Sequence, residues 1–446
     1  MSRVRWEKLL SAERQGAGPA PGAPERTVFQ QDFDRIVFTS AFRRMKDKTQ
    51  VFPLSKSDYV RTRLTHSIET SCVGRSLGTM IGRELVARHS LSLDASDFGA
   101  VVAAACLAHD IGNPPFGHAG EDAIREWFKA SGLLDRHVFT AAERSDFENY
   151  EGNAQGFRIL TRLQSPANPG LQLTRAVLAT FTKYPRGSAL PQPLTGRSAK
   201  KFGYFQQDAL SFQQVAEATG LGVRIPGIAW YRHPLAFLVE VADDTCYLIV
   251  DIEDAARLGT LPYGEAEALL GKLAGQGVQE GRLQRIHDPK ERLEYLRAKA
   301  IGQLLEAASE VFLDHEEAIL AGTFDDELLA SSPLRSVLEE VRKVSCDTIY
   351  VARSALEIET AGFEVLGALL KLFTDAVEGA CGYGVMSTRE RMLLKLLPAQ
   401  FLGEGGQPDP NPYIRLLQVA DFVAGMTDSY AVDLYRRLKG IELAGQ

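Results

Sequence analysis

The stretch VVAAACLAHDIGNPPFGHAGE, residues 101–121, is the segment on which the fold and the site depend. It opens with an apolar run that predicts a buried helix, and this helix ends where His109 and Asp110 stand side by side. A turn rich in glycine and proline follows at residues 112–115. The pair therefore lies between a buried helix and a tight turn, where a solvated surface pair is not expected.

Two further ionisable residues follow the turn. His118 and Glu121 stand three positions apart at the start of another predicted helix, so they share one face of it. Burying charge costs several kcal/mol per ion unless a metal ion or a partner compensates it. The whole stretch therefore indicates a metal site, provided that other helices supply further ligands.

Length and composition bound the class of protein. The 446 residues can form a large core, and a 45% apolar and 24% charged composition is ordinary for a globular protein. The net charge of −7 argues against a protein that coats nucleic acid, although it leaves room for a local basic groove. Five scattered cysteines favour reduced thiols, and the chain shows neither a signal core nor a long apolar run. We expect a cytoplasmic protein that does not span a membrane.

The N-terminal part contains an arm and a basic cluster. Residues 1–26 are expected to form a flexible arm, because residues 11–26 are rich in alanine, glycine and proline. Bases gather at residues 43–48, and Gln50 closes this cluster. A solvated helix face and a nucleic-acid contact are both compatible with such a cluster.

A long helix is predicted next, with Ser57 as its N-cap. Arg63, His66 and Thr70 lie at positions i, i+3 and i+7 of this helix and share one face. A lone helical histidine is more often structural than a ligand, but an arginine one turn away supplies a cation suited to phosphate.

The middle of the chain predicts short helices separated by loops. Residues 131–156 look irregular, helices are expected near residues 154–163 and 171–184, and a long loop spans residues 185–207. The bases in and before this loop predict either a phosphate-handling lid or an exposed insertion. The exposed insertion is equally compatible with the sequence.

A third helix carries acids on an apolar background. Asp243, Tyr247, Asp251 and Asp254 are spaced 4, 4 and 3 apart and fall on one face of the helix predicted after residue 234. Carboxylates in a row repel one another in a dry core, so this face meets a cation, a polar substrate or solvent.

The C-terminal third predicts amphipathic helices and no chemical motif. His287 and His315 are expected at the surface. We find neither strand–helix alternation nor a glycine-rich phosphate loop. The sequence therefore predicts an all-α fold, with one helical body and a helical C-terminal region.

Three helices thus offer groups to one site: His66, the His109–Asp110 pair, and an aspartate of the third helix. Two imidazoles and two carboxylates suit Mn, Fe, Co, Ni or Zn, and are tolerable for Mg. An octahedral ion with four protein ligands keeps positions open for water or a substrate oxygen, as a hydrolase needs.

These residues carry a family resemblance. The set of His66, His109, Asp110 and an aspartate resembles the metal signature of HD-domain phosphohydrolases. The segments RTRLTHSIE, LAHDIGNPPFGHAGE, FTKYP, EVADDTCYLIVDIEDA and ADFVAGMTDSYAVDLYRRL resemble, more narrowly, the dNTP triphosphohydrolases of the deoxyguanosine triphosphate triphosphohydrolase type. The match runs from about residue 26 to 440 with the motifs in order. It implies an HD-domain core over residues 27–260 and a helical C-terminal region over residues 261–446.

The resemblance also implies roles for single residues. It makes Asp243 the fourth metal ligand, His118 the catalytic histidine and Glu121 the carboxylate that orients it. Phosphate contacts are implied for Arg63, Lys183 and Tyr184, and sugar contacts for Gln50, Tyr247 and Asp251.

The implied reaction cuts a dNTP between its 5′ oxygen and the α-phosphorus, giving a deoxynucleoside and inorganic triphosphate. Mn or Mg is the expected ion, with Fe, Co, Ni and Zn as alternatives. A homo-oligomer, a hexamer by family habit, and an activating dNTP are implied as well. Two alternatives stay open: another HD phosphohydrolase or phosphodiesterase, and a nucleotide-sensing protein that binds single-stranded nucleic acid.

Overall fold

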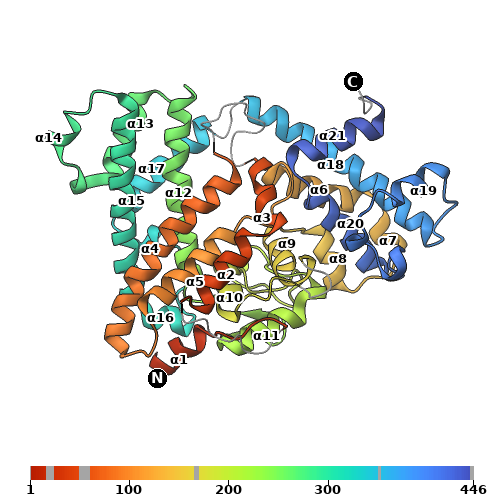
Figure 1. Ribbon diagram of the computed structural model, residues 1–446, viewed down its shortest axis with the longest axis horizontal. Helices are drawn as coiled ribbons and strands as arrows, with labels where there is room; N and C mark the ends of the chain where they lie inside the picture. Colours follow the sequence, from red (N-terminus) through yellow and green to blue (C-terminus); the bar gives the residue numbers. More distant parts are fainter. Residues whose placement is uncertain (1, 17–24, 50–60, 165–169, 350–352, 442–446) are drawn as a thin grey trace.

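The computed structural model describes residues 2–16, 25–49, 61–164, 170–349 and 353–441, with side chains from residue 5 and, in the last range, from residue 356. Figure 1 shows a helical molecule, as the sequence predicted, in which a short hairpin of β1 (Val223–Ile225) and β2 (Ala229–Trp230) is the only sheet among the described residues. The first half contains α1 (Ser2–Leu9), α2 (Val28–Val37), α3 (Ser40–Arg44), α4 (Arg63–His89), α5 (Ala95–Ala108), α6 (Gly117–Ala130), α7 (Leu133–Arg136), α8 (Ala141–Glu148), α9 (Gly152–Arg158), α10 (Arg175–Phe181) and α11 (Ala209–Thr219).

The second half begins with the helix that carries the acidic face. It contains α12 (Ala236–Arg257), α13 (Tyr263–Ala274), α14 (Glu280–Leu283), α15 (Pro289–Asp314), α16 (Glu316–Ala321), α17 (Arg335–Val344), α18 (Arg353–Ala380), α19 (Thr388–Leu394), α20 (Pro412–Ala424) and α21 (Asp428–Lys439). In Figure 1, α13, α15 and α17 stand beside α12, whereas α18 to α21 lie across the molecule beside α6 to α8.

Helices α4 and α5 pack so closely that their contact requires small residues. A Cβ atom on Gly74 would come within 2.5 Å of the Cys106 sulfur, and one on Gly78 would come within 2.9 Å of the Phe98 carbonyl. These distances are shorter than van der Waals contact, so only glycine fits there. The close packing brings the start of α4 next to the end of α5, which is where His66 and His109 lie.

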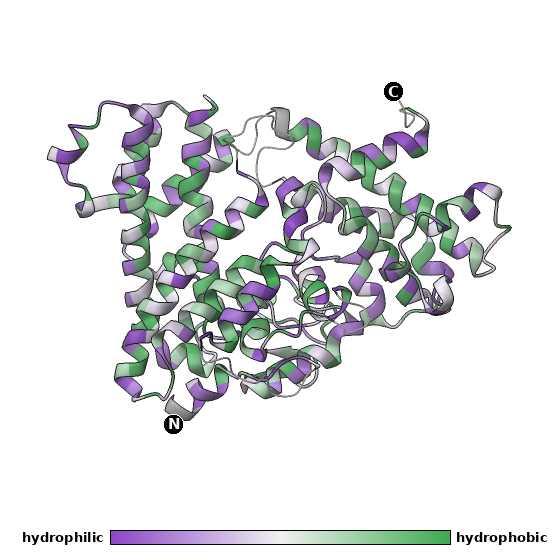
Figure 2. Ribbon diagram, viewed as in Figure 1, coloured by the Kyte–Doolittle hydropathy of each residue, from purple (hydrophilic) through white to green (hydrophobic). Residues whose placement is uncertain are grey.

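Two hydrophobic clusters form the interior. The larger one contains α1, α2, α4, α5, α10 to α13, α15 and α17. The smaller one joins α6 to α9 with α18, α20 and α21. Figure 2 shows the consequence, since apolar residues face neighbouring helices and polar residues line the outer sides. Because α6 follows α5 directly, the segment 101–121 connects the two clusters.

The N-terminal segment is not a flexible arm where the structure describes it. Trp6 is fully buried, packs edge-on to Phe98, and donates its indole N–H to Glu316 at 2.9 Å. The buried Arg14 pairs with the buried Asp32 at 2.6 Å. The composition of residues 11–26 suggested a solvated chain, but Trp6 and the Arg14–Asp32 ion pair hold residues 6–14 on the core.

Two other local predictions were wrong. The helix expected from Ser57 begins at Arg63, because Thr62 is its N-cap and forms a reciprocal capping box with Thr65; residues 57–60 lie outside the described part. The segment 131–156, expected to be irregular, contains α7, α8 and the start of α9. The many charges of this segment suggested a loop, but Thr140 and Glu143 form a capping box at the start of α8.

Candidate active site

Three helices place a histidine–carboxylate cluster at one point. The ligand atoms of His66 on α4, His109 at the end of α5 and Asp243 on α12 all lie within 4.8 Å of one another. The Nε2 atoms of the two histidines are 3.1 Å and 3.4 Å from Oδ1 of Asp243. The sequence predicted this convergence from three separate segments, and a single ion is small enough to touch all three side chains.

The tautomer of His109 fits a metal ligand. Its Nδ1 lies 2.6 Å from the carbonyl oxygen of Cys106, a distance at which Nδ1 donates a proton to that oxygen. Nε2 therefore points into the cluster, 3.4 Å from Oδ1 of Asp243, and this buried atom makes no contact of hydrogen-bond geometry among the described residues. It offers a lone pair to the cluster once its proton has left. A buried nitrogen without a partner is costly in a finished core, and a bound cation removes that cost.

Asp110 lies at the edge of the same cluster. Its Oδ2 is 3.6 Å from Nε2 of His109 and 2.6 Å from Nη1 of Arg63, and its Oδ1 accepts a 2.6 Å bond from the Asn113 amide. Burial alone would raise the pKa of this carboxyl, but the Arg63 guanidinium and the two histidines lower it to about 2. Asp110 is therefore an oriented carboxylate, as a ligand must be.

The cluster attracts a cation. Burial alone would lower the pKa of His109, yet Asp110 and Asp243 together raise it to about 9, and the histidines hold the pKa of Asp243 well below its ordinary value. The carboxylates thus make the site favour positive charge. A proton on the imidazole and a divalent ion compete for this charge, and ion binding releases the proton.

His118 and Glu121 form a second pair at the start of α6. The Nδ1 atom of His118 is 2.9 Å from Oε2 of Glu121, whose other oxygen accepts a 2.6 Å bond from the Gly152 amide. Burial would raise the pKa of Glu121, but the bond from His118 and the charge of Lys201 lower it to about 2. The His118 side chain is 79% exposed, so the pair has a buried anchor and an accessible imidazole.

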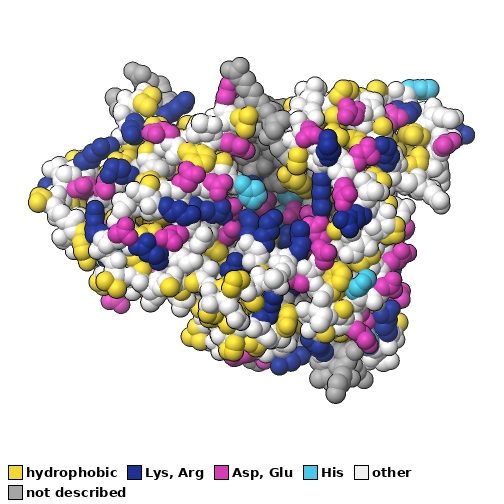
Figure 3. Space-filling model, turned by 180° about the vertical axis from the view of Figure 1, so that it is seen from behind, with side chains coloured by type: hydrophobic (Ala, Val, Ile, Leu, Met, Phe, Trp, Pro, Cys, Tyr) yellow, Lys and Arg dark blue, Asp and Glu magenta, His cyan; other side chains and the backbone are white. Residues whose placement is uncertain are grey.

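A cleft of about 370 Å³ connects these groups. Basic, acidic and amide side chains line it together with a few apolar ones: Arg63, His109, Asp110, Asn113, His118, Glu121, Asn153, Phe181, Lys183, Tyr184, Lys201, Val239, Glu240, Asp243, Asp244 and Tyr247. In Figure 3, Lys and Arg side chains gather across the middle of one face of the molecule. The cleft combines a cation site with several fixed bases, which suits a phosphorylated ligand.

The loop 185–207 is not an exposed insertion. Arg186 donates to three carbonyl oxygens of the loop itself, and Ser198 bonds Asp325 of the segment before α17. Its Lys201 reaches the cleft, 3.2 Å from Glu151 and 3.7 Å from Glu121. The base-rich loop thus contributes one lysine to the site and uses other polar groups for its own structure.

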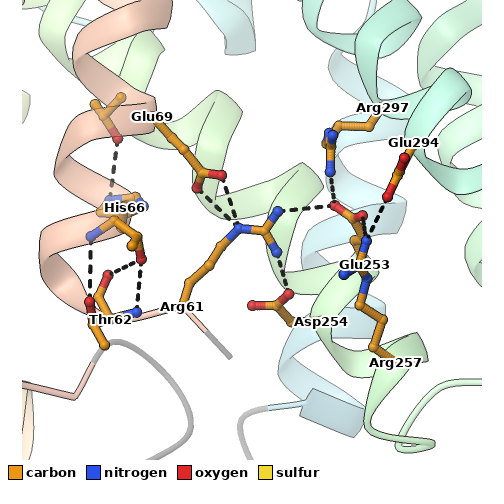
Figure 4. A network of polar contacts seen from close by, with 11 residues as sticks. Arg61, Thr62, His66, Glu69, Glu253, Asp254, Arg257, Glu294 and Arg297 are labelled. Atoms are coloured by element: carbon orange, nitrogen blue, oxygen red, sulfur yellow. Dashed lines mark hydrogen bonds and ion pairs between the residues drawn. The ribbon is translucent and has the colours of Figure 1, made fainter. Parts of the chain in front are cut away.

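The acidic face of α12 divides between two environments. Asp243 and Tyr247 line the cleft, and the buried Asp251 lies one turn beyond Tyr247, outside the set of lining residues. Asp254, one turn further, pairs with Arg61 in an ion network with Glu69 and Glu253 (Figure 4). The spacing of the acids predicted one shared face, but the charge of Asp254, at the far end of this face, is paired with Arg61.

The position of Gln50 falls outside the described residues, so its predicted sugar contact is not addressed by the geometry. His287 and His315 are exposed, as expected.

Four polar cleft residues were not predicted from the sequence: Asn113 and Asn153, whose amides were not treated as site groups, and Glu240 and Asp244, which lie close to Asp243 on α12. Glu240 lies one turn before Asp243 on α12, so its helical spacing was the available signal.

The C-terminal region supports the turn before α6 directly. The buried Asp428 accepts bonds from the Phe116 amide at 3.1 Å and the Thr49 amide at 2.9 Å. Phe116 has a left-handed backbone (φ 63°) just before α6. A residue other than glycine adopts this conformation only when its surroundings hold it there. Asp428 and the packing of Phe116 against Gly362 of α18 provide this support.

Comparison with known proteins agrees with this arrangement. Residues 63–155 match the HD domain, and residues 328–437 match the phosphohydrolase-associated domain. A deoxyguanosinetriphosphate triphosphohydrolase-like protein of Synechocystis sp. is 47% identical, covering 99% of this chain and 100% of its own. The chain belongs to this family. Proteins of the same name from Pseudomonas aeruginosa and Listeria monocytogenes are 40% and 36% identical, over 98% of this chain and 98% and 100% of theirs.

Membership confirms the resemblance drawn from the motifs and makes the protein a metal-dependent hydrolase of the HD class. The first matched range contains His66, His109 and His118, whereas Asp243 lies between the two ranges. The second range contains Asp428, which supports the turn before α6. Among the described residues, no helix combines the length and apolar character needed to cross a bilayer.

Proposed function

We propose that this protein hydrolyses a deoxynucleoside triphosphate to the deoxynucleoside and inorganic triphosphate. The observation that carries the proposal is the convergence of His66, His109 and Asp243 beside the His118–Glu121 pair in one base-lined cleft. The names of the relatives, which are 36% to 47% identical over nearly their whole length, support the same activity.

His66, His109, Asp110 and Asp243 would hold one divalent ion, with Mn or Mg as the proposed metal. When bound, such an ion polarises a phosphate oxygen and lowers the pKa of a water molecule. The Nδ1 contact of His109, the ionised Asp110 and the low pKa of Asp243 support this ligand set, and a bound ion would displace the proton from His109.

His118 would transfer the proton. Glu121 accepts the Nδ1 proton and fixes the tautomer, so Nε2 is left to exchange a proton with the leaving 5′ oxygen or with water. The exposure of the imidazole allows this contact, and its anchor is buried and stays ionised above about pH 2.

Arg63, Lys183 and Tyr184 would bind the triphosphate, and Lys201 and Asn153 line the same cleft. Four of these side chains offer a cation or a hydroxyl, which matches the charge of a polyphosphate. We assign Tyr247, Asp251 and Gln50 to the sugar, where a carboxylate can accept the 3′-hydroxyl and close packing can exclude a 2′-hydroxyl.

The remaining assignments extend the proposal. We propose dGTP as the first substrate to try, a cytoplasmic location, a homo-oligomer that is a hexamer by the habit of the family, and a dNTP as an activating effector. Neither alternative, a different HD phosphodiesterase nor a single-strand nucleic-acid binder, is favoured by the relatives.

Product analysis tests the proposed reaction. The purified protein is incubated with each of the four dNTPs, alone and in mixtures, with Mn²⁺ or Mg²⁺. Ion chromatography then identifies the phosphate products, and reversed-phase chromatography identifies the deoxynucleoside. We expect tripolyphosphate and a deoxynucleoside in equal amounts. Pyrophosphate or orthophosphate as the first product would contradict the proposed cleavage site.

A further inference from the structure

Glu240 is an unexpected residue in a cleft proposed to bind a polyanion. Its carboxylate is 3% exposed and lies on α12 one turn before Asp243. Simple electrostatics predicts that an acid there repels a triphosphate. Its contacts indicate a different effect.

Glu240 is fixed from behind. Its Oε2 accepts a 2.8 Å bond from Nη1 of Arg232, whose side chain is almost fully buried. The Arg232 guanidinium lies 3.9 Å from the centre of the Phe237 ring and 3.2 Å from Asp325. Arg232 is thus held by Glu240, Phe237 and Asp325, and it anchors one oxygen of the Glu240 carboxylate.

The other oxygen of Glu240 faces Lys183. Oε1 is 3.1 Å from the Lys183 ammonium, and Arg197 is the next base, at 3.8 Å. Burial of Lys183 lowers its pKa, whereas Glu240, with smaller contributions from Tyr184, Asp244 and Asp243, raises it above its ordinary value. Glu240 thus favours a charged ammonium at a fixed place in the cleft wall.

We propose that Glu240 is a positioning residue, which holds the Lys183 ammonium in place for the triphosphate so that this acid strengthens polyanion binding. The inference rests on the proposed function in that Lys183 contacts phosphate. Without Glu240 the flexible lysine side chain would lose its fixed partner, and ordering it would fall to the ligand. If Glu240 only repelled the triphosphate, its removal would strengthen binding of the polyanion instead of weakening it.

Equilibrium binding of inorganic tripolyphosphate to the Mn²⁺-loaded full-length protein tests whether Glu240 strengthens or weakens polyanion binding. Calorimetry compares the wild type with E240Q, K183M and the double variant. We expect E240Q and K183M each to weaken binding by about 10-fold, because each variant removes the Glu240–Lys183 ion pair, a contact between charged groups. The double variant should be no weaker than K183M, because Glu240 acts through Lys183. Tighter binding by E240Q, or single effects that multiply in the double variant, would overturn the proposal.

E327Q provides the matched control. Glu327 is also a buried carboxylate of this ion cluster, but it pairs with Arg197 and Arg342 instead of Lys183. Its removal should change tripolyphosphate affinity by no more than about 2-fold. A loss as large as that of E240Q would show that any break in the cluster weakens the site and would overturn the specific role of Glu240.

Steady-state kinetics separates positioning from general damage. E240Q should raise KM for the dNTP more than it lowers kcat, and E240D, which keeps the carboxylate, should recover part of the loss. If E240Q does not fold, E240D replaces it in the comparison with K183M. The E240D/K183M double variant should then bind tripolyphosphate no more weakly than K183M alone. The binding arm does not need turnover, so a protein that fails to hydrolyse dNTPs would refute the proposed function and leave the Glu240–Lys183 coupling measurable.

Discussion

The Nε2 atom of His66 lies 3.1 Å from Oδ1 of Asp243, although 177 positions separate the two residues in the chain. Close packing of α4 and α5, and of both on α12, makes this contact. Helix packing, not local sequence, therefore brings the proposed metal ligands together. The His118–Glu121 pair, with its accessible imidazole, lies in the same cleft and is the proposed site of proton transfer.

Replacing His118 by alanine should lower kcat by about 10²–10⁴-fold, the usual contribution of an acid or base in the transition state. His118 is not among the proposed ligands, so metal content, measured by plasma mass spectrometry, should not change. H287A, which removes an exposed histidine far along the chain, is the control and should keep wild-type activity. Loss of bound metal in H118A would assign the residue to the metal site.

The Glu121 carboxylate should stabilise the fold in a defined pH window. Its pKa is about 2 in the folded protein and 4.5 ordinarily, so it contributes stability above about pH 4.5 and loses it as the pH falls towards 2. E121Q should therefore lower the free energy of unfolding at pH 7, and the gap to wild type should narrow between pH 5 and pH 3. Urea denaturation over this pH range measures the difference in the free energy of unfolding between E121Q and the wild type.

E126Q, on an exposed acid of the same helix, is the control for that series. It should shift the free energy of unfolding by no more than about 0.5 kcal/mol at any pH. A constant gap for E121Q across the range would mean that Glu121 is not held ionised in the fold.

Truncating Trp6 should destabilise the protein strongly. The side chain is fully buried against Phe98 and Phe312, so W6A should cost about 3–5 kcal/mol in urea denaturation followed by circular dichroism. The exposed neighbour Arg5 gives the control, R5A, with an expected change below about 0.5 kcal/mol. A W6A protein as stable as the wild type would mean that the N-terminal segment is a flexible arm after all.

The sequence predicted the all-α fold and the site more fully than the local structure. His109–Asp110 and His118–Glu121 were recognisable because each pair sits at a helix end beside a glycine- and proline-rich turn. The start of α4 and the presence of α8 were missed, because capping by Thr62 and Thr140 depends on short-range bonds that competing caps and charges obscure.

Tertiary contacts explain the other differences. Asp254 looked like a member of the acidic face of α12, but Arg61, from a distant part of the chain, neutralises it. Glu240 looked like an ordinary helix residue, because its partners Lys183 and Arg232 lie 57 and 8 positions away and meet it only in the folded protein. Periodicity shows which face of a helix a residue shares, but not which side chain it meets.

A crystal structure of the protein soaked in Mn²⁺ and tripolyphosphate, with anomalous data at the manganese edge, shows whether the three helices hold one ion. We expect one strong peak in the cleft, bonded to His66, His109, Asp110 and Asp243, with the polyphosphate extending from it towards Lys183. A peak elsewhere, or an ion that leaves His66 and Asp243 unbound, would contradict the proposed metal site.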